Sequence, residues 1–169
     1  MYLWWTPSLF LPTMRTSEIL GERNALNPMI APSYVVASLI LLMFHLESFW
    51  YRPNESEEIA DEHRFDESVL VWIQAEEKDD EDRVAVLRKM VKNIRWLANK
   101  VGCNRIILHS FAHLGPSKAD PAVADELINE VSRRLRDRGF EVHIVPFGTF
   151  HEFAMHVKGP SLAKVFKMF

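Results

Sequence analysis

Two long amphipathic segments, each lying between short apolar runs, constrain the fold of this sequence more than any other feature. The first is KDDEDRVAVLRKMVKNIRWLANKVG, residues 78–102, and the second is ADPAVADELINEVSRRLRDRG, residues 119–139. In the first, apolar residues recur at steps of three or four, at Val84, Leu87, Val91, Ile94, Leu97 and Val101. In the second, the apolar face is formed by Val123, Leu127, Ile128, Val131 and Leu135. Both spacings predict helices with one buried stripe.

The ends of both helices are marked in the sequence. Asp79 or Asp80 can cap the first helix, where acidic side chains also suit the helix dipole, and Gly102 ends it. In the second helix Asp120 is a natural N-cap and Pro121 occupies the first helical position. Gly139 is the predicted stop of the second helix, so these features predict where each helix begins and ends.

Apolar, β-branched runs flank the helices and predict strands. They are SVLVWIQAE, CNRIILHS and FEVHIVPFG, residues 68–76, 103–110 and 140–148. Strands that alternate with helices indicate an α/β domain, with a mixed sheet and two long helices on one of its faces.

Three further segments complete the predicted domain. Residues 34–45, too short to span a bilayer, predict a buried strand, and ESFWYRP after them a second strand or turn. Residues 149–159 predict a hairpin partner for the strand at 140–148, and residues 160–169 a short helix. We therefore expect one domain over residues 35–169. Residues 1–34, which contain four prolines, predict a poorly ordered extension that is not required for activity.

Composition excludes several classes of protein. No P-loop, G-x-G-x-x-G, C-x-x-C or G-x-S-x-G pattern occurs in the 169 residues. The single cysteine, Cys103, rules out an internal disulfide and fits a reducing compartment, so we expect a cytoplasmic protein. Residues 1–82 carry 16 acidic side chains and 5 Lys or Arg, whereas residues 83–169 carry 7 and 15. The basic half is either a solvated helix surface or a face for a polyanion such as RNA.

Histidines supply the candidate functional groups. His113 follows a predicted strand and precedes a helix cap, a position that α/β sheets often use for sites. His109 and His113, four apart on extended chain, are too far apart to share a metal ion. A metal site across the predicted hairpin, with His143 and His156, is a separate alternative.

Four short motifs occur in an order that resembles a known family. They are FAHL at residues 111–114, PAVADELINEVSRRLRDRGFEV at 121–142, PFG at 146–148 and KGPSLA at 158–163. Together they resemble the editing domain of archaeal-type threonyl-tRNA synthetases, which has the D-aminoacyl-tRNA deacylase fold. The similarity runs from about Leu39 to Ala163, and it indicates a freestanding version of that domain.

The resemblance implies an aminoacyl-tRNA deacylase that removes serine wrongly attached to threonine tRNA, without a metal or other cofactor. It implies that the substrate is the acceptor end of a charged tRNA. It also implies a homodimer that acts beside a threonyl-tRNA synthetase lacking its own editing domain, with no membrane association. By position in the motifs, His113 and His151 are the predicted catalytic residues. The predicted substrate-binding residues are His45, Ala112, Pro146, Phe147, Gly148, Phe150 and Lys164.

Two departures from the family bear on the substrate. Where the family has Tyr-Tyr-Lys after PFG, this chain has Thr149, Phe150 and His151. A family glutamate near the C-terminus corresponds to Lys164, which reverses its charge. The identity of the amino acid removed therefore does not carry over from the family. Two other functions stay open from the sequence: a non-catalytic module that binds tRNA or a synthetase, and a metal-dependent hydrolase.

Overall fold

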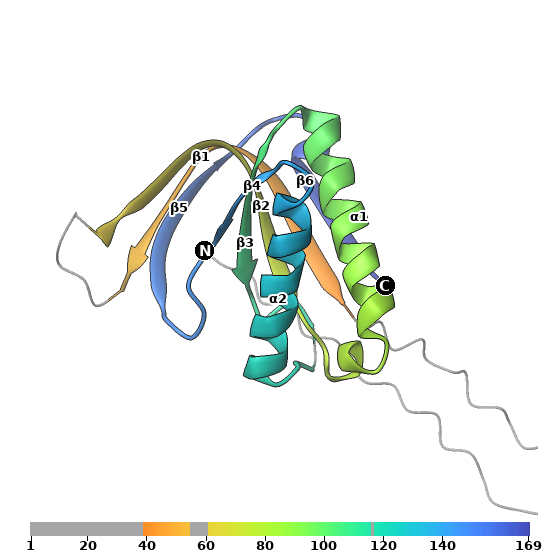
Figure 1. Cartoon of the computed structure of the whole chain (residues 1–169). Helices are drawn as coiled ribbons and strands as arrows, with labels where there is room; N and C mark the ends of the chain where they lie inside the picture. Colours follow the sequence, from red (N-terminus) through yellow and green to blue (C-terminus); the bar gives the residue numbers. More distant parts are fainter. Residues whose placement is uncertain (1–38, 55–60, 116) are drawn as a thin grey trace, which may run out of the picture. The chain divides into compact units, whose positions relative to one another are not determined.

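The computed structural model describes residues 39–54, 61–115 and 117–169 (Figure 1). The extension predicted over residues 1–34 lies outside them. The strands are β1 Ile40–Pro53, β2 His63–Gln74, β3 Arg105–Ser110, β4 Glu141–Ile144, β5 His151–Val157 and β6 Lys164–Met168. The helices are α1 Arg83–Val101 and α2 Pro121–Arg136, and η2 Glu77–Asp80 and η3 Ser161–Ala163 are short 3₁₀ turns.

The strands form one mixed sheet in the order β4-β3-β2-β1-β5, with β6 also paired to β1. The strands β2, β3 and β4 are parallel, while β1 is antiparallel to each of its neighbours β2, β5 and β6. In the β1–β2 register, Ile40 lies opposite Gln74. The predicted mixed sheet is therefore confirmed.

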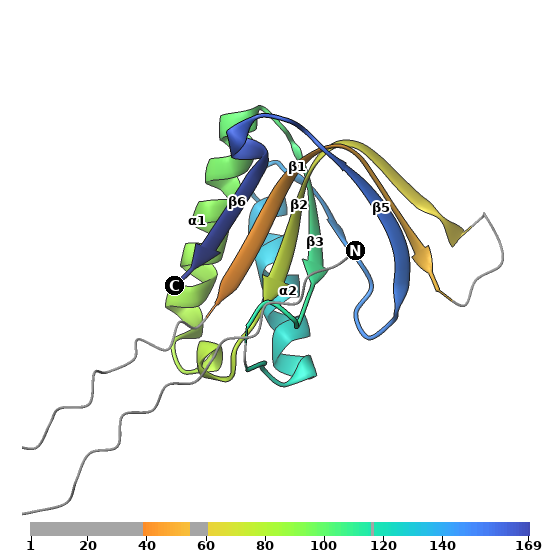
Figure 2. The same cartoon turned by 180° about the vertical axis from the view of Figure 1, so that it is seen from behind.

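Both helices lie against the same face of the sheet, as predicted (Figures 1 and 2). Their buried residues share one core with alternate residues of β1, β2 and β3. Gly102 ends α1 in the left-handed conformation, at φ 70°, as the sequence predicted. Asp120 caps α2 by accepting a hydrogen bond from the Ala122 N–H at 2.8 Å.

Two details of α1 differ from the prediction. Its cap is Asp82, whose carboxylate accepts from the Ala85 N–H. Asp79 instead belongs to η2, where its side chain accepts a hydrogen bond from the Glu76 N–H. Val84, predicted in the buried stripe, is 72% exposed, because Val86 and Leu87 turn toward the sheet in the first turn of the helix.

Three strand predictions were wrong, each about long-range pairing. ESFWYRP is not a separate element, because β1 continues through it to Pro53 as one strand. The segment at 149–159 forms β5, which pairs with β1 rather than with β4. The end of the chain, predicted as a helix, forms η3 and then β6, which also pairs with β1. Among the described residues, no helix is long and apolar enough to cross a membrane.

Candidate functional site

A cavity of about 380 Å³ lies where β2 and β3 end and α2 begins. Pockets in α/β folds commonly form at the carboxyl ends of strands, since the loops that carry ligand-binding groups meet there. Its lining is mainly apolar and consists of Ile73, Gln74, Ala75, Ser110, Ala112, Lys118, Ala119, Pro121, Ala124, Phe147, Gly148, Thr149 and Phe150. An apolar enclosure with a few polar groups suits a small organic ligand with an aromatic part.

Gln74, the last residue of β2, anchors the loop that forms one wall of this cavity. Its side chain is buried, and its Oε1 accepts hydrogen bonds from the Leu114 N–H and, at 2.7 Å, from the Gly115 N–H. Its Nε2 donates to Glu76 Oε1 and to the Ser117 carbonyl, both at 2.6 Å. The amide thus uses both its donors and both its acceptor positions. This arrangement fixes the backbone of the loop after β3.

Glu76 completes this buried network from the other side. Besides the Gln74 amide, its carboxylate accepts a hydrogen bond from the Ser117 hydroxyl. Burial raises the pKa of Glu76, and the hydrogen bond from Gln74 opposes part of that increase. Two backbone bonds also hold the ends of the loop, because Phe111 N–H donates to the Ile73 carbonyl and Ala119 N–H to the Ala75 carbonyl. Residues 111–115 and 117–119 of this wall are therefore held by hydrogen bonds to the end of β2.

Gly115 packs so closely in this loop that a larger residue would displace buried side chains. A Cβ atom there would lie 2.7 Å from Gln74 Nε2, 2.7 Å from Glu76 Oε1 and 2.8 Å from Ile40 Cδ1. Sequence reasoning missed Gln74, Glu76 and Gly115 as parts of the site. The sequence did contain one indication of them: in WIQAE, the polar residues Gln74 and Glu76 follow an otherwise apolar strand.

The turn between β4 and β5 forms the opposite wall. Phe147 and Phe150 line the cavity and are 39% and 88% exposed, so their rings are free to cover a ligand. Gly148 between them has a φ of 77°, which favours glycine. The turn is tied to β1 by the Asn54 N–H, which donates to the Phe150 carbonyl at 2.9 Å.

Four of the predicted substrate-binding residues therefore meet at this cavity: Ala112, Phe147, Gly148 and Phe150. Pro146 precedes Phe147 directly and is exposed, but it does not line the cavity. His113 follows Ala112 in the anchored loop, where its exposed ring lies edge-on to Phe111 at 5.7 Å. It is next to a lining residue in the chain but is not itself part of the lining.

His151, the other predicted catalytic residue, begins β5 and turns away from the cavity. Its ring is edge-on to Tyr51 at 5.1 Å and to His109 at 6.3 Å, and its buried Nε2 has no hydrogen-bond partner among the described residues. Burial lowers the pKa of His151, and the nearby His63 lowers it further. His151 is therefore a neutral imidazole at pH 7 in this position.

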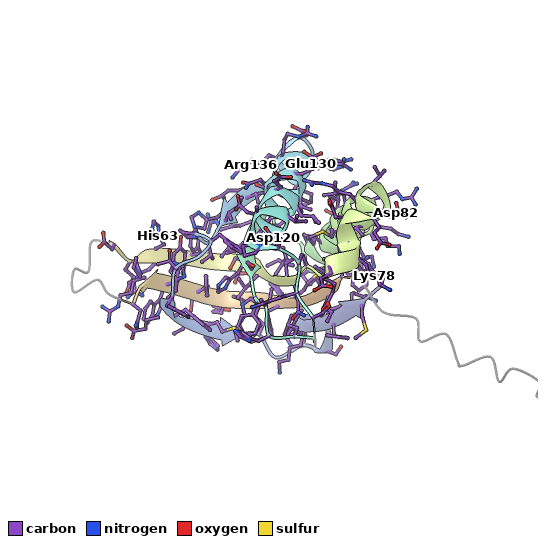
Figure 3. The ribbon with its side chains drawn as sticks, turned by 90° about the horizontal axis from the view of Figure 1, so that it is seen from below. His63, Lys78, Asp82, Asp120, Glu130 and Arg136 are labelled. Atoms are coloured by element: carbon purple, nitrogen blue, oxygen red, sulfur yellow. The ribbon has the colours of Figure 1, made fainter. Side chains whose placement is uncertain are left out.

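We call the group around His151 the imidazole cluster: Tyr51, His63, His109, His143 and His151. It lies on the sheet face that the helices leave uncovered. The Tyr51 hydroxyl and His143 Nε2 are 2.6 Å apart, and the His63 ring stacks on Tyr51 at 4.8 Å. Burial raises the pKa of Tyr51 to about 12 and, together with His151, lowers the pKa of His109 to about 4. In Figure 3, His63 lies toward one end of the sheet, and Asp120, which marks the start of α2, lies apart from it.

The structure places His45 and Lys164 on opposite faces of the sheet and away from the cavity. Phe44, next to His45, pairs with Lys164 across β1 and β6. His45 lies five residues along β1 from Ile40, about 17 Å from the cavity end of the strand. Its Nε2 is 3.6 Å from Glu67 Oε2, and Glu67 also pairs with Lys158. Neither His45 nor Lys164 contributes to the lining.

The hairpin metal site considered from the sequence does not form, since β4 and β5 are not paired. Within the described residues, no group of three or more His, Cys, Asp or Glu side chains is arranged to hold a metal ion. The histidines of the imidazole cluster are among the residues searched. They pack against aromatic rings and are not arranged around a common point as metal ligands are.

The fold and the position of the cavity define the class of protein. Two solved structures match it, each 13% identical in sequence: a probable eukaryotic D-amino acid tRNA deacylase, with TM-score 0.60 over 78% of this chain and 100% of that chain, and a c-Myc DNA unwinding element binding protein, with TM-score 0.58 over 76% and 97%. The predicted D-aminoacyl-tRNA deacylase-like fold is therefore confirmed.

The sequence then places the chain in a particular family. Residues 39–169 match the archaea-specific editing domain of threonyl-tRNA synthetase, and the chain belongs to that family. It is 33% identical over 133 residues to the threonine–tRNA ligase of Thermococcus kodakarensis, a match that covers 74% of this chain and 21% of the ligase. The chain thus spans about a fifth of the curated relatives that it matches. The resemblance predicted from the four motifs is confirmed.

Proposed function

We propose that this chain hydrolyses the ester that links a wrongly attached amino acid to the terminal adenosine of tRNA. Membership in the editing-domain family and the deacylase-like fold support this activity. The observation that carries the proposal is the cavity itself, because its two walls come from the family motifs FAHL and PFG. Serine on threonine tRNA is the leading substrate.

The cavity offers a place for the adenosine. Phe147 and Phe150 present exposed rings on one wall, and aromatic rings stack on nucleobases with little regard to sequence. Thr149 and Ser110 provide hydroxyl groups, and Lys118 provides the one charged side chain of the lining. The ester then lies toward the anchored loop at Ala112.

The chemistry needs few acid–base groups. An aminoacyl ester is already activated, so the protein has mainly to orient a water molecule and stabilise the oxyanion that forms at the carbonyl. The proposed catalytic residues stay His113 and His151. Each directly follows a residue of the lining, His113 after Ala112 and His151 after Phe150. The 2′-hydroxyl of the substrate assists in the attack, as the family resemblance implies.

The network of Gln74 and Glu76 has a positioning role in this scheme. It holds the N–H groups of Leu114 and Gly115, which are thereby unavailable to the substrate. We therefore assign stabilisation of the oxyanion to groups beside them, at Ala112 and His113. The rigidity of the loop keeps those groups in place before the substrate binds.

One observation favours a second function, a non-catalytic module that binds tRNA or a synthetase. The ring of His151 packs against Tyr51 and His109 rather than facing the cavity, which leaves few polar groups beside the ester. A threonyl-tRNA synthetase that lacks its own editing domain, and a second copy of this chain, are the proposed protein partners. A cytoplasmic location is part of the same proposal.

A deacylation panel separates the two functions. Threonine tRNA charged with serine, threonine, alanine or glycine is incubated with the purified chain, with and without a chelator. Hydrolysis of the seryl ester ahead of the threonyl ester, unaffected by the chelator, is expected. Binding of tRNA without turnover on any charged form would instead favour the non-catalytic module.

A further inference from the structure

A basic groove runs between α1 and α2 on the side of the helices away from the sheet. It has a volume of about 520 Å³, and its lining is Val84, Arg88, Val91, Lys92, Arg95, Trp96, Asn99, Arg134 and Arg138. Five of these nine residues are cationic and none is acidic. We call it the interhelical groove. Nothing in the proposed hydrolysis makes use of it.

The cations of the helix pair differ in how their charges are balanced. At the start of α1, Arg83 pairs with Glu126 at 2.9 Å, and near the end of α2, Arg133 pairs with Glu130 and Asp137. In the interhelical groove, Arg88, Lys92 and Arg95 have no ion pair with any acidic side chain of the described residues. The unpaired positive charge of the groove is therefore carried by α1.

Helix stability does not account for these three cations. Arg134 and Arg138 lie near the end of α2, where positive charge suits the helix dipole, and Arg134 is paired with Glu130 at 2.7 Å. Arg88, Lys92 and Arg95 lie in the interior of α1, and Arg88 and Lys92 are like charges four residues apart, which destabilises a helix. A bound polyanion would remove that repulsion.

Two side chains of the groove also indicate a missing partner. The Nε of Arg95 is buried without an acceptor among the described residues, an uncommon state for a guanidinium N–H. Trp96 is 42% exposed, with Lys167 over its ring at 5.6 Å. An aromatic face beside unpaired cations is typical of a surface that binds nucleic acid.

We propose that the interhelical groove binds the sugar–phosphate backbone of the tRNA whose charged end enters the cavity. That choice of RNA rests on the proposed function. The path along α2 supports it, because Pro121 lines the cavity and Arg134 lines the groove, about 20 Å apart at 1.5 Å per helical residue. Figure 3 labels Asp120, just before α2, and Arg136 at its other end. One tRNA can thus contact both places.

The test compares two double variants with the same change in charge. Arg88→Gln with Lys92→Gln removes two unpaired cations of the groove. Arg83→Gln with Arg133→Gln removes two cations that are already paired with acids. Affinity for uncharged threonine tRNA is measured from about 50 to 300 mM salt. The groove variant is expected to bind at least tenfold more weakly near 100 mM salt, with the slope of log K against log salt reduced by about 1.5. The control is expected to change affinity less than threefold.

Kinetics distinguish this inference from the proposed function. With charged tRNA, the groove variant should raise KM and leave kcat unchanged, while hydrolysis of a free aminoacyl-adenosine ester stays at the wild-type rate. If the wild-type chain hydrolyses nothing but its tRNA affinity still depends on Arg88 and Lys92, the groove stands and the hydrolysis fails. If the groove variant binds tRNA with wild-type affinity and wild-type salt dependence, the inference is overturned. This is the result expected if the groove binds an acidic protein instead of tRNA. The single variant Lys92→Gln, exposed in mid-helix, checks that any loss is not due to unfolding.

Discussion

Gln74 and Gly115 are fixed to each other across 41 residues of sequence, since the Gly115 N–H donates to Gln74 Oε1 at 2.7 Å while Gln74 Nε2 fills the space that a Cβ on Gly115 would need. The hydrogen bond can form only because Gly115 has no side chain, which lets the Gln74 amide come this close to its backbone. The end of one strand thereby determines the shape of the loop that follows another.

Gly115→Ala is expected to lower the free energy of unfolding by about 1–3 kcal/mol, because the new methyl group overlaps buried polar atoms of Gln74 and Glu76. Deacylation should fall at least tenfold as the wall of the cavity shifts. Gly159→Ala is the matched control, since nothing lies within 4 Å of a Cβ there. Urea unfolding and the seryl-tRNA assay measure both effects, and equal behaviour of the two variants would contradict the close packing.

Gln74→Leu is expected to cost about 2–4 kcal/mol of stability, because it leaves the N–H groups of Leu114 and Gly115 and the Ser117 carbonyl without their partner. Hydrogen exchange at Leu114 and Gly115 should accelerate more than exchange in the middle of α1. Asn93→Leu, which removes an exposed amide bonded to the Lys89 carbonyl, serves as the control. Unchanged protection of the two loop amides would show that the loop is held by its backbone bonds alone.

His113→Ala and His151→Ala are each expected to reduce kcat for seryl-tRNA at least tenfold. The first removes an imidazole next to Ala112 of the cavity lining, and the second removes a ring that packs against Tyr51 and directly follows Phe150. His156→Ala, at an exposed position of the same strand as His151, should leave the rate within twofold. Wild-type rates in both test variants would refute the proposed catalytic pair.

Stability should decrease in mild acid because of His109. Its pKa is lowered to about 4 in the folded chain, by burial first and then by His151, against about 6.5 in the unfolded chain. Between these values the unfolded state binds more protons, so the free energy of unfolding falls as the pH drops from about 6.5 to 4, by up to about 3 kcal/mol. His109→Leu should flatten this dependence in urea unfolding measured at several pH values, whereas His156→Gln should not. A slope that persists in His109→Leu would assign the effect to other groups.

Removal of residues 1–33 is expected to leave both deacylation and the melting temperature unchanged, because the family match begins at Leu39. The shortened and full chains are compared in the same assay and thermal scan. A drop in either quantity would show that these residues contribute to the domain.

Local sequence features predicted the helices well. Asp120, Pro121 and Gly102 act through neighbouring backbone groups, so their effects can be inferred from the sequence. The partner of β5 could not be inferred, because its alternating pattern fits pairing with β4 or with β1 equally well. Of the cavity lining, only residues within or beside the family motifs FAHL and PFG were predicted: Ala112, Phe147, Gly148 and Phe150. The bond from Gln74 to Gly115 and the contact of Tyr51 with His143 join residues far apart in sequence.

The pairing of β1 has a consequence for the order in which the chain folds. One edge of β1 is covered by β2, but its other edge is covered by β5 and β6, which end at residues 157 and 168. During synthesis, that second edge stays open until residues 151–168 have left the ribosome. Open strand edges promote association between chains, and pairing over long sequence separation is slow. Deleting the five residues of β6 should therefore increase aggregation of the nascent chain far more than the small loss of core would explain.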